Sequence, residues 1–154
     1  MTKMIEEIPV FIYTFLACFS FCFIFRFHKI PHMIAAATGG MLSWVFYVAC
    51  MPLGNDLAQY LISTIIVSAY AEVMARVRKC PAMPYLVIAI LPLLPGAGVY
   101  YTMSLGLEGN RMDAVAKGLE PVGIAGSLAV GILLVSTVFR LIYRHVQGAR
   151  AEKS

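Results

Sequence analysis

Five stretches of this chain are long and apolar enough to cross a lipid bilayer. Each approaches or exceeds the roughly 20 residues that, at about 1.5 Å rise per residue, span a hydrocarbon core about 30 Å thick. The runs are Ile8–Phe25, Met33–Met51, Leu57–Ala75, Cys80–Leu107 and Pro121–Phe139. Only 13% of all residues are charged, far fewer than in soluble domains. The sequence therefore predicts an all-α integral membrane protein: five transmembrane helices, at about 8–25, 33–51, 57–75, 82–107 and 121–143, in a single domain over 1–154.

The basic residues predict how the chain is oriented in the membrane. Five crossings place the two termini on opposite sides of the bilayer. With the N-terminus outside and the C-terminus inside, the inner face holds most of the Lys and Arg, as the positive-inside rule requires. The inner set is Arg26, Lys29, Arg76, Arg78, Lys79, Arg140, Arg144, Arg150 and Lys153, and the outer set is Lys3, Arg111 and Lys117. The net charge of +4 thus follows from membrane topology and does not indicate a nucleic-acid partner.

The cysteines and histidines do not form a metal or cofactor motif. Cys18, Cys22, Cys50 and Cys80 lie within or at the ends of the expected helices, at spacings that suit no tetrahedral metal site. His28, His32 and His145 lie at helix ends beside basic residues, where an interfacial role is expected. We therefore expect neither a metal nor a cofactor.

Small residues at spacings of four predict close helix packing in two of the spans. Ala35, Gly39 and Ser43 form one such face, and a second consists of Gly123, Ser127 and Gly131. In lipid, helices associate through close backbone approach, which small side chains permit. These faces indicate neighbouring helices and not chemistry.

The third span carries a polar stripe. Tyr60, Thr64, Ser68, Glu72 and Arg76 follow one another at spacings of four, so their side chains lie along one side of a helix. An ionisable group at membrane depth is costly unless it faces protein or water, which favours a proton-coupling or gating role. Alternatively, the carboxylate simply pairs with the arginine one turn away and reaches the interface. Both interpretations remain open from the sequence.

The fourth span is interrupted by prolines and glycines near its middle. Its 28 uncharged residues exceed what a straight crossing needs, and Pro92–Gly98 is expected to be kinked or unwound. Unpaired backbone at membrane depth survives only inside protein or along a wet cavity, as in the broken helices of secondary transporters. A half-helix beginning near Gly98 would offer free amides to an anionic group. The alternative is a proline kink that only shapes packing. The residues expected to face a substrate are Pro92, Pro95, Gly96, Gly98, Tyr100, Tyr101 and Thr102.

Ala71 to Met103 reads AEVMARVRKCPAMPYLVIAILPLLPGAGVYYTM. This stretch resembles the threonine/serine exporter family, in which an Ala/Ser-Glu-x-x-Ala-Arg helix ending precedes a basic turn, a proline, and a helix with Pro-Leu-x-Pro-Gly followed by Tyr and Thr-Met. Elsewhere the resemblance rests on five hydrophobic spans and on length, which fit the small-subunit type corresponding to the second membrane half of full-length exporters. The matching positions are Glu72, Arg76, Pro92, Pro95, Gly96, Tyr100 and Thr102.

The resemblance implies a multi-pass protein of the bacterial cytoplasmic membrane that takes part in export driven by the proton motive force. The cargo would be threonine and serine or, in two-component members, a dicarboxylate such as succinate. A larger partner would supply a cytoplasmic N-terminal domain and five further helices. The alternatives are a structural or regulatory subunit whose partner holds the whole substrate site, and an intramembrane enzyme, for which the sequence offers no catalytic set.

Overall fold

The computed structural model describes residues 2–25, 27 and 29–151 and, within them, the side chains of residues 10–25, 27, 29–52 and 54–143. In this part every element is a helix. The elements are α1 (Thr2–Ile24), α2 (Ile30–Ala49), the 3₁₀ helix η1 (Met51–Leu53), α3 (Asp56–Val77), α4 (Ala82–Ile90), the 3₁₀ helix η2 (Leu91–Leu93), α5 (Gly96–Leu107) and α6 (Arg111–Ala151). The expectations for Arg26, His28 and Lys153 fall outside the described residues, and those for Lys3, Arg144, His145 and Arg150 fall outside the described side chains.

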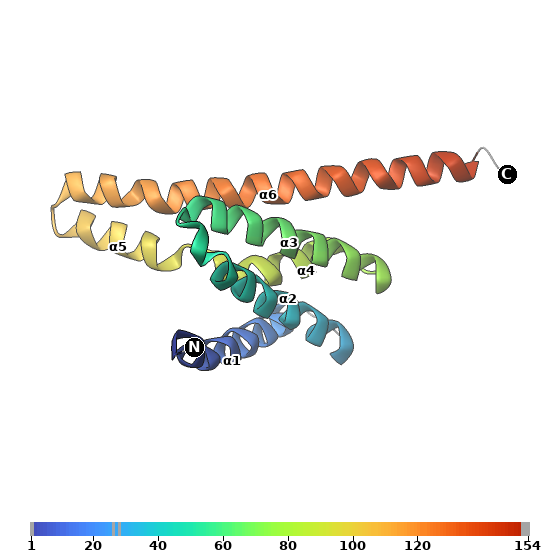
Figure 1. The fold of residues 1–154 in the computed structure, drawn as a ribbon, viewed down its shortest axis with the longest axis horizontal. Helices are drawn as coiled ribbons and strands as arrows, with labels where there is room; N and C mark the ends of the chain where they lie inside the picture. Colours follow the sequence, from blue (N-terminus) through green and yellow to red (C-terminus); the bar gives the residue numbers. More distant parts are fainter. Residues whose placement is uncertain (1, 26, 28, 152–154) are drawn as a thin grey trace.

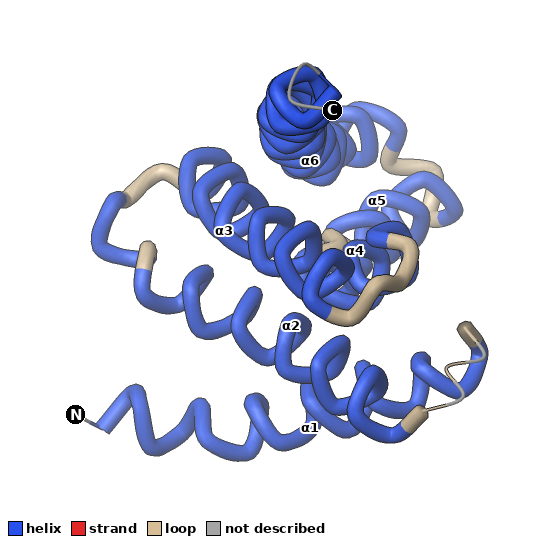
Figure 2. The backbone as a smooth tube through the Cα atoms, turned by 90° about the vertical axis from the view of Figure 1, so that its right-hand side faces the viewer, coloured by secondary structure: helices blue, strands red, loops and turns tan. Residues whose placement is uncertain are grey.

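The helices stack from α6 on one side of the molecule to α1 on the other (Figure 1). Helix α3 packs on α6 and α2, α4 packs against both α2 and α3, and α1 packs mainly on α2. Figure 2 shows α6 end-on and α1, α2 and α3 obliquely, so these three helices are inclined to α6. The stack is typical of a helical membrane domain, with short connections between neighbours.

Two groups of buried side chains hold the stack together. The first joins α1, α2, α3 and α4 and includes Cys18, Cys22, Met33, Ala36, Ala71, Tyr85 and Ile88. The second joins η2 to α6 and consists of Ile90, Leu93, Ile124 and Leu128, with Tyr47 and Tyr60 packed against it. The second group places the interruption of the fourth span against α2, α3 and α6.

The two small-residue faces pack as the sequence predicts. Ala35, Gly39 and Ser43 are all buried. A Cβ added at Gly39 would lie 3.0 Å from Tyr70 Cε1, and one added at Gly131 would lie 2.9 Å from Thr64 Cγ2. Glycine therefore permits the close approach of α2 to α3 and of α6 to α3.

Three of the described helices are long and apolar enough to cross a membrane: α2, α3 and the Arg111–Tyr143 part of α6. The pair Ala82–Leu93 and Gly96–Leu107 counts as a fourth span if the two bent segments are one crossing, and α1 contributes a shorter apolar stretch, Val10–Ile24. The chain is thus an all-helical, multi-pass membrane protein. The count of five crossings and the orientation remain predictions.

The last helix differs from its expected bounds. Helix α6 begins at Arg111 and encloses Pro121, which was expected to start it. Residues 111–120 carry several charges and lie outside the predicted apolar runs, but they are helical. Asn110 directly precedes the helix, and its Nδ2 donates to Asp113 Oδ2 at 2.7 Å. A carboxylate in the first turn also suits the positive end of the helix dipole.

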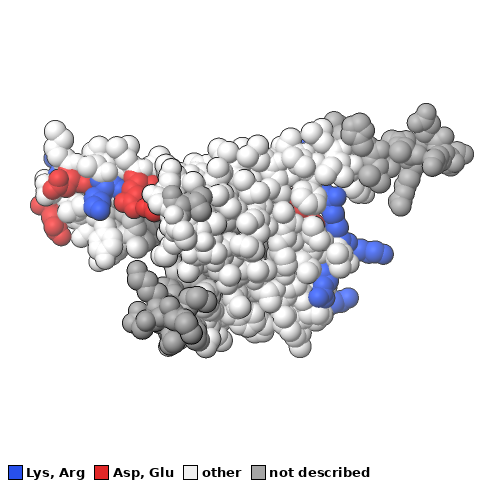
Figure 3. All heavy atoms as spheres, in the orientation of Figure 1, with Lys and Arg blue, Asp and Glu red and all other residues white. Residues whose placement is uncertain are grey.

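The α5–α6 hairpin projects beyond the Asp56 end of α3 (Figure 1). Helix α5 packs on α6 and buries none of its own residues. Figure 3 shows acidic and basic residues mixed at this end of the molecule, whereas Lys and Arg gather at the opposite end. The two ends of the molecule therefore differ in charge (Figure 3).

Candidate functional site

The carboxylate and the arginine of the α3 stripe meet at the basic end of the molecule. Arg76 Nη2 donates to Glu72 Oε2 at 3.4 Å and to the Phe139 carbonyl oxygen at 3.5 Å. The guanidinium also lies 4.9 Å from the Phe139 ring centroid and 5.4 Å from that of Tyr143, which is cation–π range. Arg76 thus links the end of α3 to α6. This geometry agrees with the simple pairing that the sequence left open beside a coupling role.

Glu72 also borders open space. A shallow cavity of about 340 Å³ at the same end is lined by Glu72, Ala75, Arg76, Lys79, Cys80, Ala82 and Tyr143. The Glu72 side chain is 19% exposed, so it is neither sealed in the stack nor fully free. A proton can reach this carboxylate from the cavity without passing through packed side chains.

The middle of the stripe is buried. Thr64 and Ser68 are both fully buried. Thr64 Oγ1 donates to the Tyr60 carbonyl at 2.6 Å, whereas Ser68 Oγ has no hydrogen-bond partner among the described residues. An unsatisfied buried hydroxyl costs roughly 1–3 kcal/mol, so it calls for a partner that protein atoms do not supply.

Two further polar side chains of α3 share this property, and the sequence argument missed them. Ser63 is fully buried and Gln59 is 3% exposed, yet Ser63 Oγ and Gln59 Oε1 have no partner within the described part of the chain. In the sequence, Gln59 and Ser63 are four residues apart and directly precede Tyr60 and Thr64 of the predicted stripe. This spacing could have indicated a second row of polar side chains on the same helix. Helix α3 therefore carries buried polar side chains, several of which lack a hydrogen-bond partner within the described residues.

The helix expected over 82–107 is interrupted, and the interruption is shorter and begins earlier than the predicted Pro92–Gly98. After η2 the chain is extended at Leu94, and α5 starts at Gly96 with a bend of 57° between the two segments. Short-range bonds replace the helical ladder, with Leu94 N donating to Leu91 O at 3.3 Å and Gly96 N to Leu94 O at 2.8 Å. Leu93 is buried while Leu94 is 57% exposed, so the break runs from the interior to the surface.

The first turn of α5 carries two backbone amides, those of Ala97 and Gly98, for which the described residues show no acceptor. The first amides of a helix lack an acceptor within their own helix, and the positive end of the dipole lies there. Gly96 is exposed, and a Cβ added to it would meet no atom within 4 Å. Pro92 and Pro95 flank the break and are partly buried.

The other expected substrate residues divide into two groups. Gly98 and Thr102 face α6: a Cβ at Gly98 would lie 3.4 Å from Pro121 Cβ, and the Thr102 hydroxyl donates to the Gly98 carbonyl at 2.8 Å. Both are explained by helix packing. Tyr100 and Tyr101 are exposed, with rings 5.7 Å apart in an edge arrangement.

The structure does not bring the two predicted clusters together. Tyr60 packs beside the break, whereas Glu72 lies twelve positions further along α3, about 18 Å away at 1.5 Å per residue. The polar stripe of α3 connects the two levels. Within the part of the chain that the structure describes, no three His, Cys, Asp or Glu side chains are grouped so as to hold a metal ion.

A comparison with protein-family models finds one match, described as Threonine/Serine exporter, ThrE, over residues 10–138. The match spans α2 to α5 completely and most of α1 and α6. No curated protein and no solved structure matches the chain.

Proposed function

Because the chain belongs to the threonine/serine exporter family, we propose that it is one subunit of a secondary exporter of threonine and serine or of small carboxylates. The family is one of transporters and not of enzymes. The observation that carries the proposal is the broken span, whose second segment begins at Gly96 with an exposed first turn. Transporters use such helix ends to bind substrate and coupling ions near the middle of the membrane.

In this proposal the first turn of α5 binds the carboxylate that threonine, serine and dicarboxylates share. Gly96 N already donates to Leu94 O and Val99 N to Pro95 O. The amides that would point at the ligand are therefore those of Ala97 and Gly98. The positive end of the helix dipole there favours negative charge. The exposed Tyr100 and Tyr101 hydroxyls lie one turn further along α5 and can hydrogen-bond the other polar groups of the substrate. Pro95 ends the regular ladder and so holds this turn open.

Glu72 couples export to the proton motive force. Protonation removes the charge of the Glu72 carboxylate and so weakens its hydrogen bond with Arg76. The Arg76 guanidinium, which also donates to the Phe139 carbonyl, can then follow a movement of α6. The unpartnered hydroxyls of Ser63 and Ser68 provide a polar route along α3 between Glu72 and the break. Alternating access then amounts to a movement of α6 and α5 against the rest of the stack.

A larger membrane partner completes the site in the bacterial cytoplasmic membrane. Helix α5 buries none of its own residues and packs mainly on α6, which leaves its other sides for a second subunit. Tyrosine hydroxyls and a free helix end do not suit hydrocarbon, which favours protein or water beside them.

A second candidate function is a structural or regulatory subunit, with the substrate site wholly in the partner. The observation that favours it is the use of Gly98 and Thr102 in packing against α6. Cross-linking of a photoreactive substrate analogue to the partner alone would support this second function.

The two proposed roles are tested by efflux from cells or vesicles loaded with labelled threonine, serine or succinate. Glu72→Gln should reduce efflux and flatten its pH dependence, while Glu108→Gln at the outer end should not. Gly96→Leu should abolish efflux by filling the space at the first turn of α5, while Gly126→Leu, on a part of α6 with nothing within 4 Å, should leave it intact. Normal flux and pH dependence in both Glu72→Gln and Gly96→Leu would contradict the proposal.

A further inference from the structure

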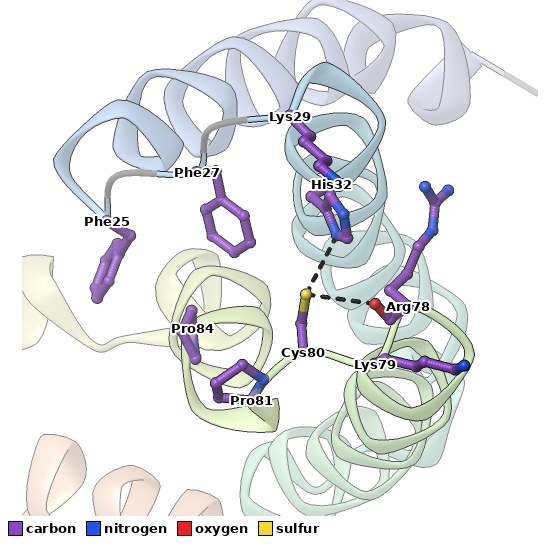
Figure 4. A pocket seen from close by; sticks show the side chains of 9 residues that line it. All are labelled: Phe25, Phe27, Lys29, His32, Arg78, Lys79, Cys80, Pro81 and Pro84. Carbon is purple, nitrogen blue, oxygen red and sulfur yellow. Dashed lines mark hydrogen bonds between the residues drawn. The ribbon is translucent and has the colours of Figure 1, made fainter.

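A pocket of about 410 Å³ opens at the basic end of the molecule, between the α1–α2 and α3–α4 connections (Figure 4). Its lining is Phe25, Phe27, Lys29, His32, Arg78, Lys79, Cys80, Pro81 and Pro84. The phenyl and proline rings supply apolar walls. Figure 4 shows Lys29 beside His32 on one side of the pocket and the Arg78 and Lys79 side chains extending from the other connection, away from the phenyl rings. Apolar walls are thus combined with a cationic rim.

The histidine of this pocket is held by a buried tyrosine. His32 Nδ1 lies 2.6 Å from the hydroxyl of Tyr85, which is 1% exposed, and 3.7 Å from Cys80 Sγ. The Tyr85 hydroxyl and the Cys80 thiol both lie against Nδ1 of His32, so Nε2 is the ring nitrogen that is left to donate to a ligand in the pocket.

Lys79 occupies a backbone position that normally belongs to glycine. It has φ 53°, and the chain around it closes α3 through Lys79 N to Arg76 O at 3.2 Å and Cys80 N to Ala75 O at 2.9 Å. Helix α5 ends in the same bonding pattern, but there the left-handed residue is Gly109 with φ 84°. A non-glycine residue in this conformation is strained, and such strain marks sites where the side chain is needed. Lysine at the pocket rim therefore carries a conformational cost that glycine would avoid.

The pocket is closed toward the interior of the stack. Beneath it lie Tyr85, Ile88, Cys22 and Met33, all buried in one group. A ligand held here has no open route toward the break near Leu93. The occupant therefore comes from the basic face or the adjoining membrane interface and stays there, unlike transported cargo.

We propose that this pocket binds the phosphodiester headgroup of an anionic phospholipid in the leaflet at the basic end of the molecule. The cations and the His32 donor suit a phosphate group, which a lipid or a free phosphate ester would share. The apolar walls formed by Phe25, Phe27 and the two prolines favour the lipid, whose glycerol and upper acyl carbons they contact. Basic pockets between membrane helices are known to bind such headgroups. The proposal does not depend on transport.

The test is native mass spectrometry of the full chain in detergent, titrated with phosphatidylglycerol, phosphatidylcholine or soluble glycerol 3-phosphate. We expect one phosphatidylglycerol bound in preference to phosphatidylcholine. Each cation near an anionic headgroup contributes about fivefold in affinity, so Lys29→Gln and Lys79→Gly should each weaken phosphatidylglycerol binding about fivefold. Lys79→Gly also relieves the strained backbone, so loss of binding in this variant cannot be ascribed to misfolding.

The matched control is Lys117→Gln, which removes one charge at the opposite end of the molecule and should leave the bound phosphatidylglycerol unchanged. Equal binding of the two lipids, full binding in both pocket variants, or an equal loss in Lys117→Gln would each overturn the proposal. Glycerol 3-phosphate binding as tightly as phosphatidylglycerol, with the same dependence on Lys29 and Lys79, would show a site for free phosphate esters and would overturn the assignment to a lipid.

Discussion

Replacing Gly131 with alanine should force α6 away from α3. The new Cβ would lie 2.9 Å from Thr64 Cγ2, 3.0 Å from Thr64 Cβ and 3.4 Å from the Leu61 carbonyl oxygen. Carbon atoms in good contact are about 3.5–4.0 Å apart, so the helices must separate by about half an ångström or more. This contact lies on the α3–α6 seam, which also holds Arg76 against Phe139.

The cost can be separated from the intrinsic gain of alanine in a helix. Overpacking of this kind costs about 1–3 kcal/mol, whereas glycine to alanine in a helix gains up to about 1 kcal/mol. Gly126→Ala on the same helix brings the same gain, and its added Cβ meets nothing within 4 Å. The difference between Gly131→Ala and Gly126→Ala therefore isolates the contact, and we expect about 1–3 kcal/mol, or a factor of about 5 to 150 in the unfolding equilibrium.

Steric trapping in bicelles measures this difference directly as a change in the free energy of unfolding. Thr64→Ser removes the crowded methyl group and keeps the hydroxyl that donates to the Tyr60 carbonyl. In the double variant it should restore part of the stability lost in Gly131→Ala, because serine keeps the Cβ that would lie 3.0 Å from the new methyl group. Equal stability of Gly131→Ala and Gly126→Ala, or no rescue by Thr64→Ser, would refute the packing of α6 on α3 described above.

Two further substitutions are read out by the same assay. Arg76→Lys keeps the charge but loses the planar group 4.9 Å from the Phe139 ring centroid. We expect the free energy of unfolding to fall by about 0.5–1 kcal/mol. An unchanged free energy of unfolding would show that the stacking contributes nothing. Tyr70→Phe removes the hydroxyl that donates to the Ala35 carbonyl at 2.9 Å and should cost about 1 kcal/mol, whereas the exposed Tyr101→Phe should cost much less. Equal effects of the two tyrosine substitutions would contradict the role given to the partly buried hydrogen bond of Tyr70.

Features that follow from local chemistry could be predicted from the sequence. The helical class and most helix positions follow from uncharged runs of membrane-spanning length, and the break follows from two prolines beside Gly96, which no regular helix accommodates. The pairing of Glu72 with Arg76 follows from their spacing of four on one helix. Local rules suffice here because each contact lies within one or two turns.

Features that depend on contacts between distant segments could not be predicted. From the sequence, the Thr102 hydroxyl was expected to face a substrate near the break. In the structure its side chain packs beside Gly118 of α6, and its hydroxyl donates to the Gly98 carbonyl of its own helix. The start of α6 at Arg111 was not predicted, because the charged residues between 111 and 120 interrupt the apolar run. In the structure these residues lie on the helical hairpin of α5 and α6, which projects from the stack. His32 was expected at an interface, and nothing in the sequence pairs it with Tyr85, 53 residues later.

The central proposal is that water reaches the first turn of α5 and that cargo binds there. The direct measurement places a cysteine at Gly96 in a chain whose accessible Cys50 and Cys80 are replaced with serine, in vesicles of the native membrane. The account predicts rapid reaction with a charged, water-soluble methanethiosulfonate and protection by threonine, serine or succinate. Reaction with lipid-soluble maleimides alone, or labelling that none of these substrates slows, would contradict it.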